Sequence, residues 1–195
     1  MEFPADEYAA LPLYPGEETL DEPASHIAAQ PSSILCRRLD AIGFARYYLD
    51  TFRSVTSAFA IAAIDAPVHN TEEVETLMTK LGGEGSAGLF VMSDTSMVVY
   101  RKTIYSLAER YRLPTIYPYR VFAAEGGLMS YGVDVADLLQ GAASYIDRIL
   151  RGEKPNELAV QQPTRFELIV NAKAAKMLGL TIPTSMIVAA QEVIE

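Results

Sequence analysis

Three short polar segments carry the side chains best suited to hold a small ligand. They are Ser93-Asp94-Thr95-Ser96, Tyr117-Pro118-Tyr119-Arg120 and Tyr131-Gly132-Val133-Asp134, and each follows an apolar run expected to form a strand. In α/β sheets, ligands bind beyond the carboxyl ends of the strands, where loops and helix N-termini offer unpaired NH groups. The residues predicted to contact a ligand are Ser93, Asp94, Thr95, Tyr117, Tyr119, Tyr131 and Asp134.

Hydroxyl and carboxylate groups dominate the first segment, and an aspartate ends the third. Asp94 and its neighbouring hydroxyls suit an amine, an amide or a hydroxyl group of a ligand, and Asp134 suits an amine. Ser, Asp and Thr also cap helix N-termini, and both segments precede a predicted helix. Each aspartate is therefore interpreted either as a ligand contact or as an N-cap, with the cap favoured for Asp134.

Aromatic residues gather around the second segment. Their rings combine apolar area with a polar tip, which suits an aromatic or hydrophobic ligand, although such tyrosines also complete ordinary cores. Arg120 could bind a ligand carboxylate as a bidentate fork, or pair with a surface acid. The aromatic residues concerned are Tyr111, Tyr117, Tyr119, Phe122 and Tyr131.

No motif for catalysis, for a cofactor or for a metal stands out. The stretch Gly82-Gly83-Glu84-Gly85 follows a predicted helix and lacks a following Lys-Ser or Lys-Thr, which argues against a phosphate loop. Gly85-Ser86-Ala87-Gly88 lacks the spacing of a nucleophile elbow. His26 and His69 form no recognisable pair with Cys36. We therefore expect a protein that is not an enzyme, with no cofactor and no metal.

Composition limits the classes of protein and of partner. The chain has 195 residues, 50% of them apolar, and a formal net charge of −9. This size and composition predict one globular domain, with or without an appendage. The acidic balance argues against nucleic acid as a partner. A single cysteine excludes a disulfide within the chain, and no apolar run reaches the roughly 18–20 residues of a membrane-spanning helix.

Apolar runs of strand length alternate with amphipathic helices along most of the chain. Strands are predicted over 58–66, 88–92, 113–117, 128–131, 158–160 and 166–170. Helices are predicted within 34–55 and over 71–81, 98–111, 135–150 and 172–178. Alternation on this scale predicts an α/β fold with a mainly parallel, Rossmann-like sheet and helices on both faces.

The N-terminal part of the chain differs in composition from the rest. Residues 1–33 are rich in Pro, Glu and Ala and are predicted to form an irregular extension, whereas residues 34–195 are predicted to form the α/β domain. The first residues also lack a basic region followed by an apolar stretch, the pattern of a secretory signal.

A linked set of motifs runs through residues 112–183. It comprises Arg112-Leu113-Pro114-Thr115-Ile116-Tyr117, Gly126-Gly127-Leu128-Met129-Ser130-Tyr131-Gly132, Ala143-Ser144-Tyr145-Ile146-Asp147-Arg148-Ile149-Leu150-Arg151-Gly152, Gln162-Pro163-Thr164-Arg165-Phe166-Glu167-Leu168 and Asn171 to Pro183. In order and spacing these motifs resemble the substrate-binding family of ABC transporters related to tryptophan and tyrosine binders. Residues 88–94, and weakly 48–68, extend the resemblance towards the N-terminus.

The resemblance implies a type I periplasmic binding protein, in which two α/β lobes close on a solute. It implies that this chain holds chiefly the second lobe with its crossing segments and lacks most of the N-terminal lobe. It also implies a small organic solute, amino-acid-like or aromatic, and an ABC permease as partner. The family is periplasmic, while the missing secretory pattern keeps a cytoplasmic location open.

A lobe without its counterpart exposes a partly apolar inter-lobe face, so we expect a homo-oligomer formed through that face. The main hypothesis is therefore a non-catalytic solute-binding component of an ABC transporter, or a shortened relative of one. The alternative is a cytoplasmic, oligomeric interaction or regulatory module derived from one lobe. The first hypothesis predicts a ligand at the three segments, and the second predicts a protein interface that covers them.

Overall fold

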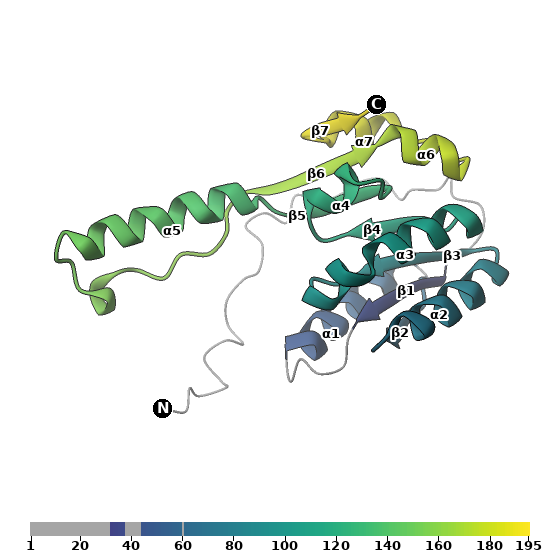
Figure 1. Ribbon diagram of the computed structural model, residues 1–195, viewed down its shortest axis with the longest axis horizontal. Helices are drawn as coiled ribbons and strands as arrows, with labels where there is room; N and C mark the ends of the chain where they lie inside the picture. Colours follow the sequence, from purple (N-terminus) through teal and green to yellow (C-terminus); the bar gives the residue numbers. More distant parts are fainter. Residues whose placement is uncertain (1–31, 38–43, 60) are drawn as a thin grey trace.

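A seven-stranded sheet organises the computed structural model of the protein, which describes residues 32–37, 44–59 and 61–195 (Figure 1). The strands are β1 (Ser32–Arg37), β2 (Ala63–Pro67), β3 (Ala87–Val91), β4 (Thr115–Tyr117), β5 (Met129–Val133), β6 (Phe166–Asn171) and β7 (Glu192–Ile194). The helices are α1 (Phe44–Ala58), α2 (Thr71–Gly83), α3 (Thr95–Tyr111), α4 (Arg120–Ala124), α5 (Val135–Leu150), the 3-10 turn η1 (Pro155–Glu157), α6 (Ala172–Leu178) and α7 (Thr184–Ala189).

The strand order is β2-β1-β3-β4-β5-β6-β7. The first five strands in this order run parallel to one another, β6 runs antiparallel to β5, and β7 runs parallel to β6. The prediction of an α/β fold with a mainly parallel sheet is therefore confirmed. Because parallel strands end at a common edge, the loops after β3, β4 and β5 lie along one side of the molecule.

The larger core lies between the sheet and helices α2 and α3, which pack side by side (Figure 1). Leu89 and Val91 of β3 point into this core and are almost fully buried. The helices contribute Val74, Met78, Leu81, Met97, Ile104 and Ala108. Fully burying one Val, Leu, Ile or Met side chain contributes about 1.5–3 kcal/mol. This core fixes α3, and with it the polar segment that precedes α3.

Helix α1 covers the opposite face of β3. Leu49 is buried there with Met92, and the rings of Phe52 and Phe90 lie 5.1 Å apart between centroids. The alternation of β3 therefore sends Leu89 and Val91 to one face and Phe90 to the other. A strand that is covered on both faces has apolar residues at consecutive positions. For this reason the burial of residues 88–92 could be predicted from the sequence.

Side-chain caps fix the ends of two of the predicted helices. The Asn70 side chain accepts a hydrogen bond from the Glu73 amide at 2.9 Å and begins α2. Asn171 caps α6 by accepting from the Ala174 amide at 2.8 Å, and its Nδ2 donates to the Ala123 carbonyl at 2.9 Å. Asn171 is buried, so this pair of bonds ties α6 firmly to α4.

An arm, residues 134–165, leaves the sheet between β5 and β6 (Figure 1). It consists of α5, η1 and a segment that returns along α5 to the sheet. The two strands at its base pair in the register Met129↔Val170 to Val133↔Phe166. The amide of Asp134 donates to the carbonyl of Arg165 at 3.0 Å and extends that pairing into the arm. The arm is thus anchored at both ends by one antiparallel strand pair.

The prediction of helix over 34–55 is wrong in its first part. Strand β1 occupies Ser32–Arg37 and pairs with both β2 and β3, and α1 begins only at Phe44. The spacing of apolar residues alone does not distinguish a short strand from one turn of helix. Here the segment is a strand because it pairs with β2 on one side and with β3 on the other.

Other differences concern short elements and the N-terminal boundary. The predicted strand at 158–160 belongs to the return segment of the arm and not to the sheet, while α4, α7 and β7 had no predicted counterpart. Residues 1–31 of the predicted extension lie outside the described residues, and its last two residues begin β1.

Gly132 provides a test of the packing at the base of the arm. A Cβ at this position would lie 1.9 Å from the carbonyl oxygen of Pro118, which is backbone and unable to rotate away. We expect Gly132→Ala to lower the free energy of unfolding by about 1–3 kcal/mol in denaturant titrations. Gly83→Ala is the control, because nothing lies within 4 Å of a Cβ there. An equal effect of both substitutions would contradict the close approach.

Candidate functional site

The loops after β3 and β4 meet at the carboxyl edge of the sheet. The hydroxyl groups of Ser93 and Tyr119 are hydrogen-bonded to each other, although the two residues are 26 positions apart. The Ser93 side chain is exposed and Tyr119 is half-buried. The structure therefore brings together two of the residues predicted to contact a ligand, and leaves their polar groups accessible from solvent.

Asp94 acts as the N-cap of α3. Its Oδ1 accepts a hydrogen bond from the Ser96 amide at 2.7 Å and another from the Ser96 hydroxyl. The capping interpretation of the first segment has this geometric support, and a ligand contact by Asp94 stays a prediction. Thr95 is the first residue of α3, and its side chain lies outside the described side chains.

The two tyrosines of the second segment have different surroundings. Tyr117 is 1% exposed, and its ring stacks on Phe122 at 5.3 Å and meets Tyr105 edge-on at 5.5 Å. Burial raises the pKa of the Tyr117 hydroxyl well above its ordinary value. Tyr119 lies at the outer side of this cluster, where its ring faces Phe122 at 6.4 Å. Tyr117 therefore packs in the core beneath the carboxyl edge, and the side chain of Tyr119 lies at the edge itself.

The third segment lies next along the edge. Tyr131 is 50% exposed and stacks on Phe166 at the start of β6, with ring centroids 6.1 Å apart. Asp134 caps α5 through its Oδ1, which accepts from the amides of Ala136 at 3.0 Å and Asp137 at 3.1 Å. Four neighbouring strands, β3 to β6, thus deliver polar or aromatic groups to one edge.

Arg120 and Asp134 both have ionic partners within the chain. Arg120 forms a hydrogen-bonded ion pair with Glu192 of β7, which raises the pKa of its guanidinium. An Arg165 nitrogen lies 3.8 Å from Asp134 Oδ2. Of the two interpretations of Arg120, the pairing with a surface acid is therefore the arrangement in this structure.

Sequence reasoning missed Phe166, Arg165 and Glu192 as residues of the edge. Phe166 and Arg165 arrive there because β6 is antiparallel to β5, so its start adjoins the end of β5. Glu192 reaches Arg120 across 72 positions through the pairing of β6 with β7. No local pattern of residues tells whether a strand will run parallel or antiparallel to its neighbour.

His69 follows β2 and is engaged in a local pair. Its Nδ1 lies 2.9 Å from Glu73 Oε2, and the hydrogen bond from His69 lowers the pKa of Glu73. The Tyr100 hydroxyl donates to the His69 carbonyl at 2.8 Å. Among the described residues, no three His, Cys, Asp or Glu side chains are grouped as metal ligands would be.

A cavity of about 380 Å³ lies away from this edge, between α3 and α6 over the starts of β4 and β5. Its lining includes Tyr105, Leu113, Thr115, Tyr117, Leu128 and Leu178. Of the residues predicted to contact a ligand, only Tyr117 lines it. The described part of the chain therefore keeps its accessible polar and aromatic candidates at the carboxyl edge.

The family model of the ABC transporter substrate binding protein matches residues 45–194. The chain therefore belongs to this family, and the resemblance seen in its motifs is confirmed. Its members bind substrates rather than transform them. No curated protein matches the chain. Within the described residues, no helix is both long and apolar enough to cross a membrane.

Three solved structures are similar to this chain. A domain from Streptococcus pneumoniae in complex with L-Trp is 22% identical, with a TM-score of 0.73, over 84% of this chain and 55% of that one. A conserved domain protein from Vibrio cholerae is 21% identical, with a TM-score of 0.72, over 83% and 54%. An open, ligand-free substrate binding protein with adhesive properties from Clostridium difficile is 18% identical, with a TM-score of 0.61, over 84% and 54%.

These likenesses confirm the fold of a periplasmic binding protein. The chain spans about half the length of each of these structures. Its own solute and partners are therefore matters for proposal.

The two roles of Asp134 can be separated by substitution. Asp134→Ala removes the cap of α5, and we expect faster hydrogen exchange at the amides of Ala136 and Asp137 and a loss of about 1 kcal/mol of local stability. Asp134→Asn keeps a capping oxygen and removes only the charge, so exchange at these amides should stay near that of the parent. Equally fast exchange in both variants would contradict the assignment of Asp134 Oδ1 as a hydrogen-bonding cap.

Proposed function

We propose that this chain is the solute-binding lobe of an ABC transporter substrate-binding protein, and that its carboxyl edge forms one wall of the solute site. The observation that carries the proposal is the convergence of Ser93, Tyr119 and Tyr131 from three neighbouring strands, with exposed or half-buried side chains. An edge of this kind combines apolar rings with a few placed polar groups, as small-molecule sites do.

The proposed ligand is an amino acid or a related compound with an aromatic side chain. A flat ring can extend the stack formed by Tyr131 and Phe166, which supplies dispersion and apolar contact. The paired hydroxyls of Ser93 and Tyr119 offer donors and acceptors for a polar group, and Asp134 offers a carboxylate for an ammonium group. The L-Trp complex of the similar Streptococcus pneumoniae domain supports this choice by likeness of fold.

The proposal also covers the release of the bound solute to a transporter. The solute is held and released without chemical change, and the lobe delivers it to an ABC permease from the periplasmic side. A single lobe contacts the solute from one side only, so we expect weak binding by the 195-residue chain.

Chemical shift mapping tests the site directly. Adding L-tryptophan, L-tyrosine or L-phenylalanine at millimolar concentration to the isotope-labelled chain should shift the amides that follow β3, β4 and β5. We expect Tyr119→Phe to weaken the binding about 2- to 12-fold, the effect of one lost hydrogen bond of 0.5–1.5 kcal/mol.

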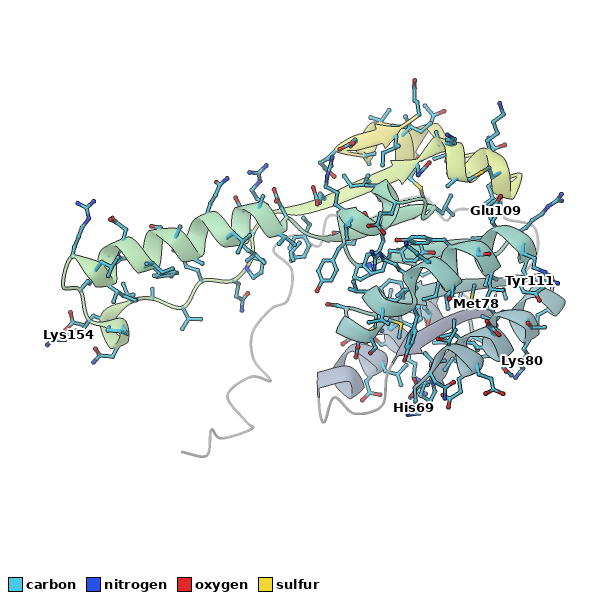
Figure 2. The ribbon with its side chains drawn as sticks, in the orientation of Figure 1. His69, Met78, Lys80, Glu109, Tyr111 and Lys154 are labelled. Atoms are coloured by element: carbon cyan, nitrogen blue, oxygen red, sulfur yellow. The ribbon has the colours of Figure 1, made fainter. Side chains whose placement is uncertain are left out.

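Tyr111→Phe is the matched control. The Tyr111 hydroxyl lies 3.0 Å from Thr79 Oγ1 at the other end of α3 (Figure 2), so its loss should leave the binding unchanged. Shifts confined to the cavity between α3 and α6, or no shifts with any of the three amino acids, would refute the proposed site.

A further inference from the structure

The cavity between α3 and α6 lies outside the candidate solute edge and is large enough for a ligand. Figure 1 shows α6 next to the last turns of α3, and the two helices are in contact. The space between them is about 380 Å³, and small-molecule sites typically measure roughly 300–1,000 Å³. An apolar cavity of about 150 Å³ already admits benzene. This cavity can therefore hold a small aromatic molecule.

The floor of the cavity is buried and mostly apolar. Ala108 of α3 and Ala174 of α6 line it, and their short side chains leave the space between the two helices open. The polar floor residue is Thr115, whose hydroxyl donates to the Leu113 carbonyl at 3.0 Å. The larger buried residues of the floor are Leu113, Tyr117, Leu128 and Leu178. A floor of this composition favours an apolar group in the interior.

Two aromatic side chains belong to the lining. Tyr105 of α3 and Tyr117 of β4 meet edge-on, with ring centroids 5.5 Å apart. A third ring can extend such a pair, because aromatic rings prefer edge-on or offset contacts. The Tyr105 hydroxyl is buried, and among the described residues it has no hydrogen-bond partner. A ligand hydroxyl that reaches it after a small shift of the ring would supply that partner.

The rim of the cavity is exposed and polar, and its charges offset one another. The Glu125 carboxylate pairs with Arg101, whose Nε lies 2.5 Å from Oε2. The hydrogen bond from Arg101 and, to a smaller extent, the charge of Lys102 lower the pKa of Glu125. Glu109 lies about two turns beyond Lys102 on α3. A charged ligand group would therefore meet a like charge together with the opposite one, and a neutral ligand is favoured.

We propose that this cavity is a second binding site, for a small neutral aromatic compound with one hydroxyl group. The ring would occupy the buried floor, and the hydroxyl would lie toward α3, where Tyr105 and Ser106 carry hydroxyls at successive positions. The cavity lies over the starts of β4 and β5, at the opposite end of the strands from the carboxyl edge. The proposal therefore goes beyond the proposed solute, and neither depends on the other.

Methyl NMR of the 195-residue chain tests the site with benzyl alcohol as the probe. Titration should give saturable shifts of the methyl groups of Leu113, Leu128 and Leu178, while the amides that follow β3, β4 and β5 stay unchanged. Benzoate and benzylammonium are similar in size but charged. Each should bind at least about tenfold more weakly than benzyl alcohol.

Two substitutions fill the space from different sides. Ala174→Leu adds an isopropyl group to the buried wall, and Ser106→Phe places a ring at the rim, so each should weaken the binding of benzyl alcohol by more than about tenfold. Ser106 is exposed, so its variant keeps the test valid if Ala174→Leu disturbs the fold. Ser144→Phe, at an exposed position of α5, is the control and should leave the binding unchanged.

Three results would overturn the proposal. They are the absence of saturable methyl shifts, undiminished binding by either filled variant in its folded form, and binding of benzoate or benzylammonium as tight as that of benzyl alcohol. Failure of the aromatic amino acids to bind at the carboxyl edge would instead refute the proposed solute and leave this site standing.

Discussion

The antiparallel pairing of β6 with β5 is the interaction on which both the candidate site and the arm depend. It reverses the direction of the sheet beside the last parallel strand, so the start of β6 arrives where β5 ends. Phe166 stacks on Tyr131, and Arg165 comes close to Asp134, for this reason. The same pairing closes the base of the arm, and it requires a glycine at 132 because the Pro118 carbonyl lies where a side chain would be.

The edge formed in this way is open on the side away from the sheet. Its groups come from four neighbouring strands, and most of them are exposed or half-buried. An arrangement of this kind suits a surface that a ligand and a second body complete together, and the chain spans about half the length of the similar solved structures.

Much of the fold could be predicted from the sequence, because its signals are local. The capped helices α2, α3 and α5 and the buried run of β3 follow from periodicity, caps and glycines. Strand β1 could not be predicted, since its pairing with β2 and β3 lies far along the chain. For the site, we expected the loops at the carboxyl ends of neighbouring parallel strands to lie together, and the contact between Ser93 and Tyr119 agrees with this. This expectation could not tell that Tyr117 would enter the core, because burial in β4 alternates from Thr115 to Tyr117 around a half-buried Ile116, and the residue types do not show this alternation.

The central claim is that the carboxyl edge holds an aromatic amino acid. The chain contains no tryptophan, so the fluorescence of added L-tryptophan reports on the ligand alone when excited beyond the absorption of tyrosine. Titrating the chain into a fixed concentration of L-tryptophan should give a saturable rise in fluorescence anisotropy, and Tyr131→Ala should weaken it about tenfold by removing one ring of the stack. No rise, or an unchanged rise with Tyr131→Ala, would contradict the account.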